Sequence, residues 1–125
     1  MPNHKLFKVN QDAVIKNNNG EFLILKQNDV WKLPGGRLED DETAKEGLLR
    51  EIKEETAIID CKIDKIINIG LSGSKSTYLV TFLCSTEEIE VILSDEHTEY
   101  AWVDVKDLDR YNFQHNELKD LIKIT

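Results

Sequence analysis

The chain has 125 residues and a formal net charge of −8, with 32% charged and 40% hydrophobic residues. This length predicts one domain, residues 1–125, with enough surface to bury a core. The acidic balance argues against a nucleic acid polymer as partner, because phosphate backbones are bound by lysine and arginine.

The sequence also bears on the cellular compartment. Residues 1–12 hold no apolar segment of the kind found in secretion signals, and no run approaches the roughly 18 apolar residues of a membrane span. We therefore expect a cytoplasmic protein that does not act at a membrane. Cys61 and Cys84 form no CxxC pair, and we expect two free thiols rather than a disulfide.

Strands and turns are predicted before residue 37. Residues 6–15 form an apolar segment with polar interruptions that favours a strand. Asn19-Gly20 is typical of a tight hairpin turn. Residues 22–25, with the sequence FLIL, predict a strand covered on both faces. Residues 26–30 are a polar loop, and residues 31–36, WKLPGG, lead to the next element.

Residues 42–56 are predicted to form a helix, because they contain many good helix formers and no proline. Asp40 or Asp41 is the expected N-cap residue. At about 100° per residue, one side of this helix is apolar and is expected to face the core. The apolar side consists of Ala44, Leu48, Leu49 and Ile52.

Three carboxylates lie on the helix face next to the apolar side. Glu51, Glu54 and Glu55 stand at positions i, i+3 and i+4, so they share one face, with Gly47 projecting from its middle. We expect Gly47 to leave space for an ion and the phosphate it carries. Oxygen ligands suit Mg²⁺, or Mn²⁺ in its place, and fit zinc poorly. The structural alternative is an ordinary solvated face rich in glutamate and lysine.

The segment 36–58 resembles the signature of the Nudix hydrolase family, G-x5-E-x7-R-E-U-x-E-E-x-G-U, where U is a bulky aliphatic residue. A chance match to the main positions is expected about once in 10⁵ trials or less. One position departs, because Ala57 stands where the family has glycine; it either adopts a strained left-handed conformation or ends the helix differently. The matching residues are Gly36, Glu42, Arg50, Glu51, Ile52, Glu54, Glu55 and Ile58.

Four strands and two helical segments are predicted after the helix. The strands are expected at residues 61–71, 77–85, 87–93 and 100–103, with a flexible turn at 72–76 and a polar loop at 94–98. A short helical turn at 105–108 and a terminal helix at 113–124 follow. The terminal helix is expected to point Leu118, Leu121 and Ile122 inward.

The order of these elements indicates an α+β fold, a mixed β-sheet with helices packed on it. The resemblance implies the Nudix-type α/β/α sandwich, with residues 36–58 forming its loop–helix–loop. It further implies an enzyme that hydrolyses the pyrophosphate bond of a nucleoside diphosphate linked to another moiety. In this reading Glu51, Glu54, Glu55 and the Gly36 carbonyl hold Mg²⁺.

The resemblance also suggests catalytic roles. Glu54 or Glu51, ahead of Glu99, would take the proton of the attacking water, and Arg50 would orient a carboxylate with support from Glu42. Family members often place a further glutamate in the loop that corresponds to residues 94–99. Glu99 is the first choice for it and Glu96 the second, with solvation of the loop as the alternative.

His97 in the same loop is a candidate general base, but a single histidine in a loop is more often solvated. Substrate contacts are expected from Arg37 and Lys32, and Trp31 could stack on a nucleobase, although a single tryptophan before a tight loop is more often a packing anchor.

A short chain with little beyond the motif is most similar to the MutT-like nucleoside triphosphate pyrophosphatases. ADP-ribose, nucleotide sugars and dinucleoside polyphosphates remain alternative substrates. The alternative from another class is a non-catalytic nucleotide-binding module of the same fold. Both a monomer and a homodimer are compatible with the sequence.

Overall fold

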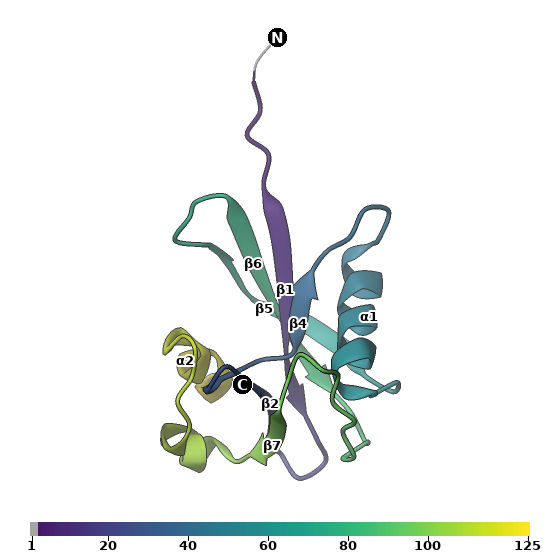
Figure 1. Ribbon diagram of the computed structural model, residues 1–125, viewed down its shortest axis with the longest axis vertical. Coiled ribbons are helices and arrows are strands. Elements are labelled where there is room, and N and C mark those ends of the chain that lie inside the picture. The colour runs from purple at the N-terminus through teal and green to yellow at the C-terminus, as the bar shows by residue number, and fades with distance from the viewer. Residues whose placement is uncertain (1–2) are drawn as a thin grey trace.

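The fold was analysed in a computed structural model, which describes residues 3–125. Within this range one sheet contains seven strands, and three helical segments accompany it (Figure 1). The elements in chain order are β1 (Lys8–Lys16), β2 (Phe22–Gln27), β3 (Val30–Lys32), β4 (Gly35–Arg37), α1 (Ala44–Thr56), β5 (Lys62–Leu71), β6 (Thr77–Ser85), β7 (Glu99–Val103), the 3₁₀ helix η1 (Val105–Arg110) and α2 (Glu117–Lys123).

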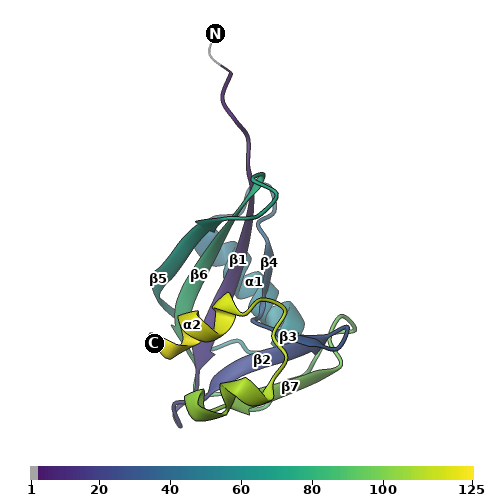
Figure 2. The same ribbon diagram turned by 90° about the vertical axis from the view of Figure 1, so that its left-hand side faces the viewer.

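The sheet is mixed, as expected from the sequence. Its main path runs β3-β2-β1-β6-β5, with β4 paired to β1 and β7 paired to β2. Strands β1 and β6 run parallel, whereas the other pairs are antiparallel. Helix α1 covers one face, and η1 and α2 lie on the opposite face (Figures 1 and 2). This is the predicted α+β sandwich, with β1 at its centre.

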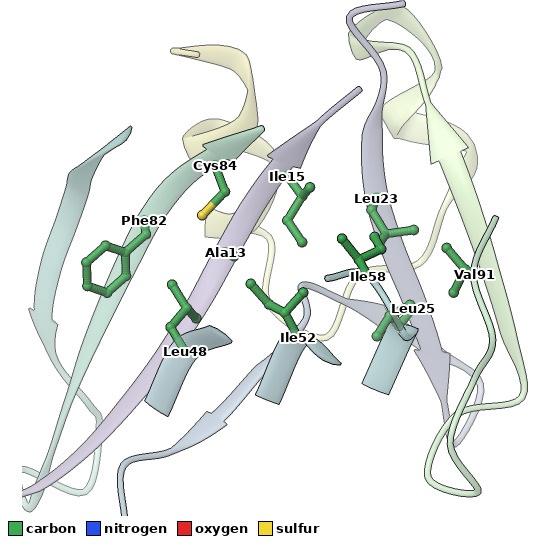
Figure 3. Close-up of a cluster of buried hydrophobic side chains, with 10 residues drawn as sticks. All are labelled: Ala13, Ile15, Leu23, Leu25, Leu48, Ile52, Ile58, Phe82, Cys84 and Val91. Atoms are coloured by element: carbon green, nitrogen blue, oxygen red, sulfur yellow. The ribbon is translucent and has the colours of Figure 1, made fainter. Parts of the chain in front are cut away.

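The two faces of the sheet carry separate hydrophobic cores. Side chains of a strand alternate between faces, so β1 directs Ala13 and Ile15 to the α1 side and Val14 to the α2 side. Figure 3 shows how side chains from α1 and from the sheet meet in the first core, including Leu48 and Ile52. The second core contains Val14, Phe22, Ile24, Leu33, Val103, Leu108, Phe113, Leu118 and Ile122.

Strand β2 confirms the prediction that both of its faces are covered. Leu23 and Leu25 belong to the core beneath α1, and Phe22 and Ile24 belong to the core beneath α2. All four side chains are buried. A continuous apolar sequence is therefore the correct signal for a strand enclosed between two helical layers.

Helix α1 begins later than predicted. Its N-cap is Thr43, whose side chain accepts from the Glu46 amide while Glu46 reaches back to the Thr43 amide, so Asp40 and Asp41 were the wrong choice. This capping box satisfies two amides at once, which a single aspartate does not. At the other end Ala57 has φ 64° and ψ 9°, so the helix does end on a left-handed alanine.

The predicted strand at residues 87–93 is wrong, since the structure describes this whole segment and finds no strand in it. The segment instead covers the C-terminal end of α1. Val91 packs in the first core, the Ile92 amide donates to the Thr56 carbonyl, and the Trp102 indole donates to the Ile89 carbonyl. Its backbone is therefore held by a helix end and a side chain rather than by a ladder.

The terminal helix is shorter than predicted. Residues 112–114 lie beside β3 instead, where the Trp31 amide donates to the Asn112 carbonyl and the Gln114 amide donates to the Trp31 carbonyl. Leu118 and Ile122 do point inward, as expected. The short strands β3 and β4 were not predicted, because three residues carry too little periodicity to be recognised.

Among the described residues no helix has the length and apolar character to cross a membrane. Cys61 and Cys84 both carry free thiols.

Candidate active site

The two glycines of β4 lie against the carboxylates of α1. Pairing with β1 places Gly35 opposite Asp12 and Gly36 opposite Gln11. A Cβ added to Gly35 would overlap the Gln11 carbonyl oxygen, and one added to Gly36 would lie 2.6 Å from both carboxylate oxygens of Glu51. Glycine at position 35 therefore allows β4 to pack closely on β1, and glycine at position 36 leaves room for the Glu51 carboxylate of α1.

Glu55 is tied to the same strand. Its Oε1 accepts a 2.7 Å hydrogen bond from the Gly35 amide, and the residue is 2% exposed. Burial raises the pKa of Glu55 to about 7, although the Gly35 amide favours the charged form. Burial also raises the pKa of Glu51, although Arg50 opposes that shift. Each carboxylate would therefore gain from a nearby cation.

Arg50 connects the carboxylates. Its guanidinium donates to both oxygens of Glu42, with Nε–Oε2 at 2.6 Å and Nη2–Oε1 at 2.9 Å. Nη1 donates to Glu51 Oε1 at 2.9 Å and to Glu54 Oε2 at 3.3 Å, and Nη2 donates to the Arg37 carbonyl. The bond to Arg50 lowers the pKa of Glu42. This geometry suits a positioning role for Arg50 and Glu42.

Residues 94–98 bring two more groups to this region. Ligand atoms of Glu55, Glu96 and His97 all lie within 4.8 Å of one another. His97 is only 4% exposed, so the expectation of a solvated histidine is wrong. Burial lowers the pKa of the His97 imidazole, and the nearby Lys32 lowers it further.

Glu99, the first choice for the loop glutamate, does not join this cluster. Strand β7 begins at Glu99, opposite Lys26 of β2, and Glu99 Oε2 lies 3.0 Å from Lys26 Nζ. The Glu99 side chain is 59% exposed. The Thr98 amide also donates to the Lys26 carbonyl, so the loop turns before Glu99 and presents Glu96 instead. Register, which sequence spacing does not reveal, decides between the two glutamates.

Gly47 serves a different purpose from the one expected. A Cβ at this position would lie 2.6 Å from Leu38 Cδ1 and 3.1 Å from Glu42 Oε1. The space is thus filled by side chains of the preceding loop, and it holds no room for an ion. Gly47 allows Leu38 and Glu42 to pack on α1, which in turn places Glu42 beside Arg50.

Three carboxylates lie near one another here, those of Glu51 and Glu55 from α1 and that of Glu96 from the loop before β7, and the Glu51 carboxylate lies against Gly36 of β4. Such donors, with two carboxylates whose charge is destabilised by burial, fit a hard dication. Glu54 is exposed and contacts Arg50, at the edge of this set.

A pocket of about 390 Å³ opens on the other side of β4. It extends from Gly35 and Gly36 along β1 to the start of α2, and its lining includes Asn10, Asp12, Lys32, Arg37 and Gln114. Lys32 and Arg37, from which substrate contacts are expected, thus line this pocket.

Trp31 lies outside the pocket lining. Its ring packs edge-on against Tyr111 with the ring centroids 5.1 Å apart, and its backbone pairs with Phe113. This placement favours the packing anchor over stacking on a substrate.

Sequence reasoning missed two polar residues in the pocket wall. Asn10 and Asp12 alternate with Gln11 along β1 and face the α2 side, and each has a buried Oδ1 without a hydrogen-bond partner in the described part of the chain. Burial raises the pKa of Asp12 to about 6, partly opposed by Thr81. The polar interruptions in the first predicted strand were the available signal.

Comparison with known proteins gives a consistent result. The family model described as NUDIX domain matches residues 6–122. A MutT-like protein of Streptomyces ambofaciens is 30% identical over 100 residues, which cover 78% of this chain and 64% of that protein. An ADP-ribose pyrophosphatase of Methanocaldococcus jannaschii is 29% identical over 121 residues, 90% of this chain and 71% of the relative. The chain thus spans about two thirds of the length of these relatives.

Solved structures show the same fold. The MutT protein of Methanosarcina mazei Go1 superposes with a TM-score of 0.78 at 27% identity, covering 98% of this chain and 95% of that one. A Caenorhabditis elegans Ap4A hydrolase superposes with a TM-score of 0.77 at 22% identity, over 92% of this chain and 93% of the other. The second likeness concerns the fold alone.

Proposed function

The chain belongs to the NUDIX domain family, and from this premise we propose that it is a divalent-cation-dependent hydrolase of the pyrophosphate bond in a nucleoside diphosphate linked to another moiety. The observation that carries the proposal is the approach of Glu51 and Glu55 to the Gly35–Gly36 backbone, beside the pocket. The pocket would take the nucleoside, and the diphosphate would cross the glycines towards the carboxylates.

The proposed cation is Mg²⁺, with Mn²⁺ as a substitute, held by Glu51, Glu54, Glu55 and the Gly36 carbonyl. When bound, it would neutralise charge on the diphosphate and make a coordinated water more acidic. Glu96 is well placed to add a further carboxylate. The exposed position of Glu54 next to Arg50 would require its side chain to turn towards the cation.

The remaining roles follow from position. Glu54 or Glu51 would accept the proton of the attacking water. Arg50 would hold Glu51 in place through its 2.9 Å contact. Arg37 and Lys32 would contact phosphate or nucleoside groups. Water adds across the P–O–P linkage, so the products are two phosphorylated fragments. Phosphoryl transfer depends mainly on such positioning and charge neutralisation. We assign no catalytic role to Glu99, because it pairs with Lys26.

Among substrates we favour a nucleoside triphosphate, as in the MutT-like enzymes. The relatives and structural neighbours also include proteins named ADP-ribose pyrophosphatase, nucleoside triphosphatase and Ap4A hydrolase. ADP-ribose, nucleotide sugars and dinucleoside polyphosphates therefore remain alternative substrates. The net charge of −8 favours a small nucleotide bound through a cation over a nucleic acid polymer or a membrane.

The test is a screen of these four substrate groups with Mg²⁺, with the products separated by anion-exchange chromatography. We expect two phosphorylated products from at least one group and no reaction with excess chelator. Glu54→Gln should lower the rate at least ~10²-fold, whereas the exposed Glu90→Gln should not. Wild-type turnover in Glu54→Gln would remove both roles from Glu54. Binding of nucleotides without turnover in any group would favour the non-catalytic module instead.

The proposal also includes a monomer or a homodimer as the oligomeric state, and the cytoplasm as the location. Size-exclusion chromatography with light scattering will distinguish a monomer from a homodimer, and cell fractionation will test the expected cytoplasmic location.

A further inference from the structure

The imidazole of His97 is completely buried and makes no hydrogen bond within the described residues. Its side chain has no exposed surface, and neither Nδ1 nor Nε2 has a hydrogen-bond partner within residues 3–125. Buried polar side chains in folded proteins almost always have a partner. A neutral imidazole has one protonated nitrogen and one free lone pair, so at least one of these atoms is available to a group from outside the chain.

Two carboxylates lie near the His97 imidazole. His97 Nε2 lies 3.5 Å from Glu55 Oε2. One ring nitrogen of His97 and one carboxylate oxygen from each of Glu55 and Glu96 lie within 4.8 Å of one another. Neighbouring ligands of a dication bound at about 2.1 Å are about 3 Å apart and opposite ligands about 4.2 Å apart. Small side-chain movements would therefore bring all three atoms to one ion.

The backbone holds this arrangement from two directions. Glu55 comes from α1 and is fixed by the Gly35 amide. The loop is fixed at its start by the bond from the His97 amide to the Ser94 carbonyl, and at its end by the bond from the Thr98 amide to Lys26. These hydrogen bonds keep the His97 imidazole next to Glu55, so an ion bound by Glu55 would lie close to the imidazole.

We infer that His97 is a nitrogen ligand in a metal site formed with Glu55 and Glu96, and that this site binds a borderline dication such as Co²⁺ or Zn²⁺ more tightly than the oxygen donors alone would. Imidazole suits these ions and is a poor ligand for Mg²⁺. The inference extends the proposed function, with which it shares Glu55, because it concerns which cation this chain selects.

The competing explanation is that His97 only supports Glu55 through the 3.5 Å contact. Burial and the positive charge of Lys32 both lower the pKa of His97, so a neutral imidazole next to Glu55 is expected on either explanation. The two explanations differ in what happens to the ring nitrogen when a metal ion binds.

The deciding experiment uses the full chain with histidine labelled with ¹⁵N. Zn²⁺ should shift one ring nitrogen of His97 strongly, by direct coordination, and Mg²⁺ should not. In parallel, calorimetric titration with Co²⁺ and Mg²⁺ compares the wild type, His97→Gln and the control His4→Gln, which changes an exposed histidine. His97→Gln should weaken Co²⁺ binding at least ~10-fold while Mg²⁺ binding changes less than about twofold.

Unshifted His97 ring nitrogens in a protein that has bound Zn²⁺ would overturn the inference, and this result does not depend on whether His97→Gln folds. Equal Co²⁺ affinity of the wild type and a folded His97→Gln variant would also overturn it. Hydrolysis with Mg²⁺ together with unshifted nitrogens would leave the proposed function standing without this inference. Nitrogen coordination without hydrolysis of any substrate would leave the metal site standing without the proposed function.

Discussion

Asp12 shows how a single buried residue links the pocket to stability. Its Oδ1 is buried without a partner, and burial raises its pKa from 3.8 to about 6. The folded state therefore holds this proton more tightly than the unfolded state does. The resulting cost is absent below about pH 4, where both states are protonated, grows as pH rises towards 6, and is complete at pH 7.

We predict that Asp12→Asn stabilises the protein at pH 7 by on the order of 1–3 kcal/mol and has little effect at pH 4. The measurement is urea unfolding at both pH values, with Asp64→Asn on the exposed face of β5 as the control. A destabilised Asp12→Asn variant at pH 7 would mean that the carboxylate is paired in the folded protein. Since Asp12 lines the pocket, we also expect substrate affinity to change in this variant.

Gly36 is a second residue at which one substitution should affect both stability and the site, in this case through the Glu51 carboxylate. An alanine Cβ would lie 2.6 Å from the Glu51 carboxylate oxygens, and that carboxylate is the end of a flexible side chain. Gly36→Ala should therefore displace Glu51 at a cost of less than about 1 kcal/mol in stability, yet lower the hydrolysis rate at least ~10-fold. Gly73→Ala is the matched control, because a Cβ there meets no atom within 4 Å. Full activity of Gly36→Ala would mean that the position of Glu51 is not critical.

At the scale of the element, α1 ends in a backbone conformation that is unfavourable for the residue found there, Ala57. Ala57 has φ 64°, where an L-residue with a Cβ is strained by roughly 1 kcal/mol and glycine is not. Ala57→Gly should raise the melting temperature by about 3–5 °C, as followed by circular dichroism. Ala44→Gly, inside the first turn of the same helix, should lower it. An unchanged or lower melting temperature of Ala57→Gly would contradict a strained Ala57.

Elements defined by their own periodicity were predictable. Strand β6 has the predicted bounds, and Leu48 and Ile52 of α1 are buried as predicted from the apolar spacing. Ala44 and Leu49 were also expected to face the core but are exposed, and Glu55 is buried instead, so apolar spacing alone did not determine the buried face. Residues 87–93 were not predictable, since their alternating pattern favours a strand while the structure uses Val91 to cover the end of α1. Local preference does not show whether a neighbouring strand is available for pairing.

The same distinction applies to the candidate site. Glu51, Glu54, Glu55 and Arg50 lie within two turns of one helix, so their proximity follows from sequence spacing. The contributions of Glu96 and His97 depend on where β7 starts its pairing with β2, which is a property of the assembled sheet. The sequence therefore predicts the grouping of these helix residues, whereas the proximity of Glu96 and His97 to Glu55 is seen only in the assembled structure.

For the whole molecule, β1 is the element that joins the two halves of the site. The Gln11 side chain lies on the α1 face of the sheet and donates to the Ala44 carbonyl, whereas Asp12 lies on the α2 face and lines the pocket. Strand β4 pairs with β1 between them, so its glycines separate the carboxylates from the pocket. The chain also carries a net charge of −8, and its buried carboxylates add to the repulsion that the folded state must overcome.

A bound dication should therefore stabilise the whole fold, and Glu55 should be required for that effect. Ligand binding to the folded state adds RT ln(1 + [L]/Kd) to the free energy of unfolding, about 2.7 kcal/mol at a hundredfold excess over Kd.

In chelator, Glu55→Gln should be as stable as the wild type or more so, because it removes a buried carboxyl whose pKa is raised to about 7. The glutamine oxygen can still accept from the Gly35 amide. With saturating Mn²⁺ the order should reverse, because only the wild type gains the full increment. Thermal unfolding at matched ionic strength measures both states, with Glu90→Gln as the control. An equal rise in Glu55→Gln and the wild type would place the stabilising cation elsewhere on the protein.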